Sequence, residues 1–233
     1  AVFKILAKES LSIHEKLIVI LDMGSKIQQC INTDEYDNIK SVVNDYLKEG
    51  IAHTLDETRN LSDSGQFEDI SLQQGIRQIL YPYEEMEVLN PEWEVILKDI
   101  IDSLFEQMSD EEYNILNEEF GTYMVSRAYE YRQLLEYLVF RYFAKSIYDY
   151  DFLGKCQMLV TNFFVIRQMD IIRWLDNHRE YSFKDRMDVV HIFSRQVEYS
   201  EDNIENLYED FIFDDIFKTD SLIAILWIDS ENI

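Results

Sequence analysis

The chain has 233 residues, of which 47% are hydrophobic, 14% aromatic and 29% charged. This balance is typical of a folded globular protein and argues against intrinsic disorder, and a chain of this length can bury a substantial core. Its formal net charge of −25 argues against nucleic acid or an anionic membrane surface as a partner, because both would repel it.

Glycine and proline are scarce, with 6 Gly and 2 Pro in the whole chain and none of either in residues 155–233. A β-rich protein needs many turns, and tight turns need residues that tolerate positive φ or pre-set the bend. The composition therefore predicts an all-α protein, an irregular bundle of roughly nine to eleven helices around two central apolar helices.

Helix-start signals recur along the first half. Ser12 is followed three residues later by Glu15, which is the spacing of a capping box. A second helix is expected to restart at residues 32–35 and to end at Gly50 as a glycine cap. Residues 51–81 indicate shorter helices broken near residues 62–65.

Further start signals follow in the middle of the chain. Asn90-Pro91 combines a cap residue with proline at the first helical position. Ser109 with Glu112 then repeats the capping-box spacing.

The second half contains the most apolar segments. Residues 122–148 are apolar on nearly every side, which predicts a central helix, and residues 152–176 predict a second one. Ser182 opens a more amphipathic helix, and two short helices near 201–211 and 221–228 complete the chain. We expect residues 1–233 to form a single domain, with 62–65 as the best candidate for a boundary.

Cysteine use and hydropathy bear on the compartment. Cys30 and Cys156 form no CxxC pair and are expected to be buried thiols in a reducing compartment. The longest run without a charged side chain, residues 156–166, is far shorter than a membrane span, and no signal peptide is visible. These features predict a soluble cytoplasmic protein, and the start without Met suggests a piece of a longer one.

Asp188 and His191 form a DxxH pair, which is half of a carboxylate-bridged di-iron motif. No other histidine has an acid three residues before it. We therefore interpret the pair as part of a solvated stripe of weak ion pairs and expect no metal site. No glycine-rich phosphate loop, nucleophile elbow or EF-hand loop is present.

Arg141, Arg167 and Arg173 lie inside the two most apolar segments, where an unpaired cation is costly. One interpretation is that nearby acids neutralise them, the candidates being Asp149, Asp170 and Asp176. The other is that the three arginines line a polar pocket between central helices, a common place for a ligand site.

The stretch LLEYLVFRYFAKSIY, residues 134–148, resembles a segment of flagellin lysine N-methylases of the FliB type. SIHEKLIVIL, residues 12–21, and the helix of residues 34–47 are similar to the middle region of the same family. The resemblance implies a bacterial protein that takes part in methylating lysine ε-amino groups of flagellin with S-adenosylmethionine.

Members of that family carry a cysteine cluster expected to bind iron and sulfur, and the present sequence lacks it. The resemblance thus implies the C-terminal helical part of such an enzyme, non-catalytic by itself, with flagellin as its protein partner and with S-adenosylmethionine and the cluster held by a full-length relative. The alternative is a stand-alone acidic protein-interaction module without enzymatic activity.

Overall fold

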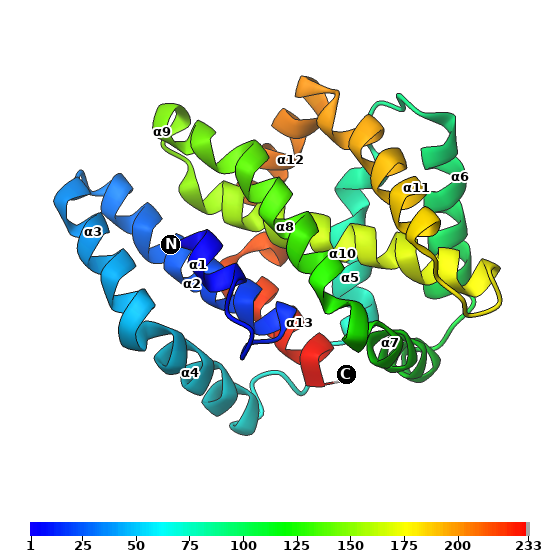
Figure 1. The fold of residues 1–233 in the computed structure, drawn as a ribbon, viewed down its shortest axis with the longest axis horizontal. Helices are drawn as coiled ribbons and strands as arrows, with labels where there is room; N and C mark the ends of the chain where they lie inside the picture. Colours follow the sequence, from blue (N-terminus) through cyan, green and yellow to red (C-terminus); the bar gives the residue numbers. More distant parts are fainter. Residues whose placement is uncertain (232–233) are drawn as a thin grey trace.

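The computed structural model describes residues 1–231 and confirms the all-α prediction (Figure 1): 83% of the residues are helical, and the described part contains no strand. Thirteen α-helical segments are joined by π-helical or 3₁₀ turns into ten continuous helical stretches, within the predicted range. Within the same residues, no helix is both long and apolar enough to cross a bilayer.

The α-helices of the first half have the following bounds: α1 Val2–Leu6, α2 Ile13–Asn32, α3 Tyr36–Asp45, α4 Ile51–Asp63, α5 Leu72–Glu84, α6 Pro91–Ile100 and α7 Asp110–Met124. Those of the second half are α8 Ala128–Tyr142, α9 Ser146–Asp149, α10 Phe152–Asp176, α11 Phe183–Phe193, α12 Glu201–Phe213 and α13 Thr219–Glu231. Three π-helical turns extend or join them, at Tyr46–Gly50, Ile101–Glu106 and Ser194–Glu198.

The helix starts lie where the sequence predicts them, because side chains satisfy the first free backbone amides. Ser12, Ser109 and Ser182 each form a full capping box with the acid three residues on. Asn90 accepts a hydrogen bond from the Glu92 amide at 3.2 Å and is followed by Pro91 at the first helical position. These caps explain why the boundaries could be predicted locally.

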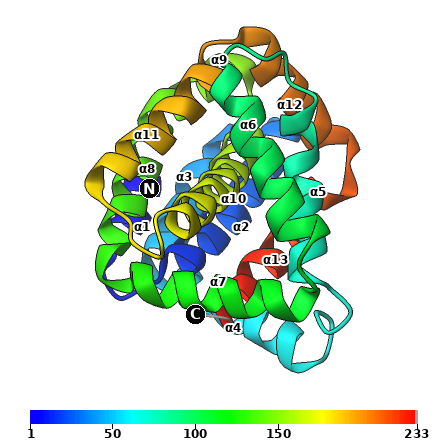
Figure 2. The same ribbon diagram turned by 90° about the vertical axis from the view of Figure 1, so that its right-hand side faces the viewer.

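Helix α10 is the centre of the molecule, and Figure 2, which looks nearly along it, shows it enclosed by the other helices. Of its 25 residues, 20 are buried. The second central helix is α2, in which Lys16 to Leu21 are all buried and which packs against both α10 and α13. Gly24 permits the close approach of α2 to α10, because a Cβ there would lie 2.6 Å from the Cys156 Sγ.

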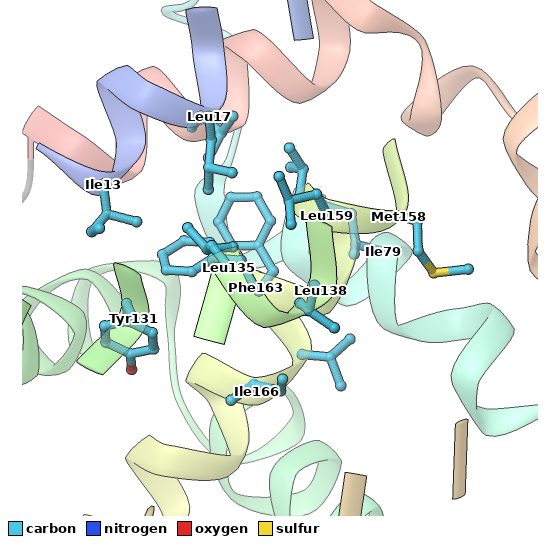
Figure 3. Close-up of a cluster of buried hydrophobic side chains, with 14 of the residues drawn as sticks. Ile13, Leu17, Ile79, Tyr131, Leu135, Leu138, Met158, Leu159, Phe163 and Ile166 are labelled. Carbon is cyan, nitrogen blue, oxygen red and sulfur yellow. The ribbon is translucent and has the colours of Figure 1, made fainter. Parts of the chain in front are cut away.

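The core is one continuous cluster of buried side chains drawn from both halves of the chain. Figure 3 shows its middle, where Leu17 of α2, Leu135 of α8 and Phe163 of α10 gather. Leu55 and Leu72, which lie on either side of residues 62–65, belong to the same cluster. The predicted break near residues 62–65 is confirmed as a turn, in which Gly65 has a φ of +81°.

The prediction that residues 122–148 form a central helix is wrong. Helix α7 ends at Met124, a 3₁₀ turn follows, and α8 then runs along the outside of α10. Phe140 is 79% exposed and Ile147 is 72% exposed. An apolar pattern on all sides does not distinguish a central helix from one that leaves apolar side chains on the surface.

The predicted helix end at Gly50 is also wrong. Gly50 has φ −60° and closes a π-helical turn that leads directly into α4. A glycine cap requires the left-handed backbone, which Gly50 does not adopt. Tyr46, which opens the π turn, is buried and donates its hydroxyl to the Asp22 carboxylate of α2, so a tertiary contact ties this turn to the core.

Candidate functional site

A buried layer of polar side chains crosses the middle of α10 and its neighbours. Its first part is centred on Asp229 of α13, which is fully buried. The carboxylate contacts His14 Nε2 of α2 at 2.7 Å and accepts a hydrogen bond from the Asn117 amide of α7 at 2.5 Å. Arg167 of α10 lies 3.5 Å from it and donates to the side-chain and backbone oxygens of Asn117. Four helices are thereby joined through one carboxylate.

These contacts keep the Asp229 carboxylate ionised. Burial by itself would raise its pKa, but Arg167, His14 and Asn117 favour the charged form more strongly and lower the pKa to about 2. A buried anion is tolerated when it is paired and hydrogen-bonded in this way.

The second part of the layer is centred on Asp170 of α10, about one helical turn after Arg167. Asp170 is fully buried, lies 2.6 Å from Arg186 Nη1 of α11, and accepts hydrogen bonds from the hydroxyls of Tyr131 and Tyr181. Burial raises the pKa of the Asp170 carboxyl, and Arg186 and the tyrosine hydroxyls oppose this shift. Arg186 also bonds the Glu130 carboxylate at 3.2 Å.

A groove of about 590 Å³ lies on another side of α10, between α6, α10 and α11. We call it the α10 groove. It is lined by Glu92, Val95, Ile96 and Asp99 of α6, by Ile172, Arg173 and Asp176 of α10, by Asp188, His191 and Ile192 of α11, and by Arg195 of the following π turn.

The π-helical turn Ser194–Glu198 fixes one end of this groove. It buries the Gln196 side chain, which accepts hydrogen bonds from the backbone amides of Leu89 at 2.9 Å and Asn90 at 3.2 Å. The end of α11 is therefore tied to the start of α6, while Arg195 on the same turn stays exposed beside the groove.

The acidic side chains of the α10 groove remain without ion pairs among residues 1–231. Glu92, Asp99, Asp176 and Asp188 bring four carboxylates to its walls. Within residues 1–231 none of them forms an ion pair, in contrast to Asp170 and Asp229. With Arg173 and Arg195 alongside, the groove presents both signs of charge with an excess of negative charge.

The three arginines proposed from the sequence lie in three different environments. Arg167 is buried at 2% exposure beside Asp229, and Arg173 is half-buried in the wall of the α10 groove. Arg141 is exposed on α8, with its guanidinium 6.0 Å from the Tyr142 ring centre. None of the three forms an ion pair with Asp149, Asp170 or Asp176 within residues 1–231.

Asp188 and His191 do lie together, both on the wall of the α10 groove. Among residues 1–231, however, no three His, Cys, Asp or Glu side chains are placed to hold one metal ion.

The two cysteines do not suit an iron–sulfur cluster either. Such a cluster is usually held by four thiolates, and this chain has two cysteines. Both are buried, and burial raises the pKa of the Cys156 thiol, so its thiolate is disfavoured.

The sequence interpretation missed His14, Arg186 and Asp229. Asp229 directly follows the apolar run LIAILWI of α13 and is followed two residues later by Glu231, so the sequence shows it only as an ordinary acid near a helix end. Arg186 lies in an amphipathic helix, where an arginine is ordinary, and His14 lies in a capping sequence. Arg186 and His14 differ from ordinary helix residues only in their contacts with residues far away in the sequence.

A family model described as the FliB lysine N-methylase C-terminal domain matches residues 1–225. The matched part includes His14, Arg167 and every residue of the α10 groove, and Asp229 lies beyond it. No curated protein and no solved structure matches the sequence.

Proposed function

Because the chain belongs to the FliB lysine N-methylase C-terminal domain family, we propose that it is the helical portion of a flagellin lysine N-methylase and holds the protein substrate. In this proposal the α10 groove is the docking surface. The family membership confirms the resemblance read from residues 12–21 and 134–148.

The observation that carries this proposal is the set of four carboxylates in the groove that form no ion pair in the described part of the chain. A substrate segment that bears lysine supplies the cations that these carboxylates lack. Arg173 and Arg195 can pair with acidic residues of the same segment, which fixes its direction in the groove. The net charge of −25 also attracts a basic segment from a distance.

We place the methyl donor and the cluster outside these residues. S-adenosylmethionine and an iron–sulfur cluster, which the family resemblance implies, belong in this proposal to another part of the full-length enzyme. Its basis is the donor set: two buried cysteines, one with a raised thiol pKa, cannot supply four thiolates. We expect the 233-residue chain alone to transfer no label from S-adenosylmethionine to flagellin.

The test is a binding titration of flagellin with the 233-residue protein, comparing wild type with the double variant Asp176→Asn, Asp188→Asn. Two charge pairs in the open groove at ~0.5 kcal/mol each predict a Kd about five-fold higher for the variant. The matched control is Asp37→Asn, Asp63→Asn, which removes two exposed acids that lie elsewhere.

Equal affinities for the groove variant and the wild type would overturn the docking surface. A second assay measures label transfer by the longest natural polypeptide that contains this chain. Flagellin binding without any label transfer by that polypeptide would favour the interaction module over the methylase.

A further inference from the structure

A second cavity, of about 220 Å³, opens next to the buried layer, and we call it the His14 cavity. Its mouth has exposed residues, Ser12 and Val125 (64% exposed), and its interior is formed by buried ones. The lining residues are Ser12, Ile13 and His14 of α2 and its cap, Gly121, Met124 and Val125 at the end of α7, Ala128 and Tyr131 of α8, and Phe163 and Arg167 of α10. The walls are therefore mostly apolar, with His14 and Arg167 as the charged or titratable groups apart from the Tyr131 hydroxyl, which is donated to Asp170.

His14 is held in one orientation within this wall. Its Nε2 lies 2.7 Å from the Asp229 carboxylate, and its ring packs edge-on against Phe163 at 5.4 Å between centroids. Because the carboxylate is ionised, Nε2 carries the hydrogen and donates it. In the neutral imidazole Nδ1 is the acceptor nitrogen, and it has no hydrogen-bond partner among residues 1–231. An imidazole oriented by a carboxylate through one nitrogen, with the other nitrogen free, is the arrangement of a general base.

The charged groups around His14 select the protonation state of a ligand. Asp229 faces the ring from α13, Arg167 lies behind it on α10, and Asn117 of α7 joins the two. The Asp229 charge is balanced by Arg167, so the cavity contains no free carboxylate to hold a cation. An apolar wall and a neighbouring guanidinium both disfavour an ammonium and favour the uncharged amine.

We propose that the His14 cavity receives the side chain of a substrate lysine and that His14 Nδ1 accepts a proton from its ammonium group. This inference rests on the proposed function, in which the substrate carries the lysine. An apolar cavity of 150 Å³ can hold benzene, which has six heavy atoms, and a lysine side chain has five beyond its Cα. The volume at His14 is therefore sufficient for four methylenes and the nitrogen.

The proton transfer balances within the two groups. The N–H bond of the lysine ammonium breaks, its electron pair stays on the lysine nitrogen as the lone pair, and the proton forms a new bond to His14 Nδ1. The positive charge moves onto the imidazolium, next to the ionised Asp229 carboxylate. The lysine nitrogen is left as a neutral nucleophile, which is the form that any methyl transfer to nitrogen needs.

The first test uses n-butylamine as a mimic of the lysine side chain and observes the histidine imidazole nitrogens of the 233-residue protein by NMR. We expect a saturable shift of the His14 signals and none for the exposed His53 and His178. Ala128→Phe fills the cavity and should abolish the shift, whereas Ala52→Phe, at an exposed position of α4, should leave it intact. Absence of a saturable shift, or an equal shift in Ala128→Phe, overturns the proposal.

The second test uses the longest natural polypeptide that contains this chain and the variant His14→Gln, which can still donate a hydrogen bond to Asp229. A lost general base predicts a fall in kcat of about 100-fold. It also predicts loss of the rising limb of the pH–rate profile, with the Kd for flagellin within two-fold of wild type. A purely structural His14 would leave the shape of the pH profile unchanged, and that result overturns the proposal.

The two proposals can fail separately. The butylamine titration is read at His14, which does not line the α10 groove, and the flagellin titration with the Asp176 and Asp188 variants does not involve His14. A failed flagellin titration with a positive butylamine titration would remove the docking surface and keep the lysine pocket.

Discussion

Arg167 and Arg173 lie on the same helix, but their surroundings differ completely. Arg167 is enclosed at 2% exposure and bonded to Asn117 and Asp229, whereas Arg173 lines an open groove and forms no ion pair within residues 1–231. Asp170 and Asp176 differ in the same way, since Asp170 is paired with Arg186 and Asp176 forms no ion pair with any residue that the structure describes. The charged side chains of the buried layer are paired with one another, and charges in the α10 groove remain available to a ligand.

This contrast has a physical cause. A charge taken out of water must find several partners, so a buried arginine or aspartate in a stable protein is nearly always bonded. A charge beside water needs no partner, and the fold can leave it free. The same residue types therefore stabilise the protein on one side of α10 and can serve recognition on the other.

The largest expected effect on stability is the difference between Arg167 and the other two arginines. Arg167→Ala leaves the buried Asp229 without its cation and should lower the free energy of unfolding by about 3–5 kcal/mol. Arg173→Ala and Arg141→Ala should each cost less than about 0.5 kcal/mol, because neither arginine forms an ion pair among residues 1–231. Urea unfolding of the three variants measures this order, and a large loss for Arg173→Ala would abolish the contrast.

A smaller effect is expected from Tyr131→Phe. The Tyr131 hydroxyl donates to the buried Asp170 carboxylate at 2.7 Å, and a hydrogen bond to a charged group contributes about 1.5–3 kcal/mol. Thermal unfolding should show that loss, with Tyr129→Phe, at an exposed position of the same helix, as the control. Equal stability of the two variants would show that Asp170 does not need this bond.

The buried layer should also make the free energy of unfolding depend on pH in the acidic range. The pKa of Asp229 is about 2 when folded and near 3.8 when unfolded, so its contribution is fully present above about pH 4. It is lost as the pH falls through 2, and the shift corresponds to about 2 kcal/mol. The difference in unfolding free energy between wild type and Asp229→Asn should therefore shrink by about 2 kcal/mol between pH 6 and pH 2. A constant difference over this range would mean that Asp229 is not specifically held as an anion.

The smallest effect on stability is expected in the α10 groove. Asp176→Asn and Asp188→Asn should change the free energy of unfolding by no more than about 0.5 kcal/mol, because both acids are without ion pairs within residues 1–231. The same variants are the ones expected to weaken flagellin binding. A loss of stability above 1 kcal/mol would assign the groove acids to the fold rather than to a ligand.

The sequence by itself determined the local features of this protein. The helical class followed from the shortage of glycine and proline, and the starts at Ser12, Asn90, Ser109 and Ser182 followed from capping side chains that act within one turn. The family resemblance was also readable, since it lies in contiguous stretches of residues. Each of these depends on neighbours in the chain.

Only the tertiary structure decided which charges pair. Asp229 contacts His14 at the other end of the chain, and Arg186 reaches Asp170 on a different helix. The sequence offered Asp149, Asp170 and Asp176 as nearby partners for the arginines, whereas Arg167 pairs with Asp229 from α13. Packing likewise placed 122–148 on the outside and α2 at the centre. Helical periodicity fixes the faces of one helix, and the neighbour that each face meets is set by the arrangement of all the helices together.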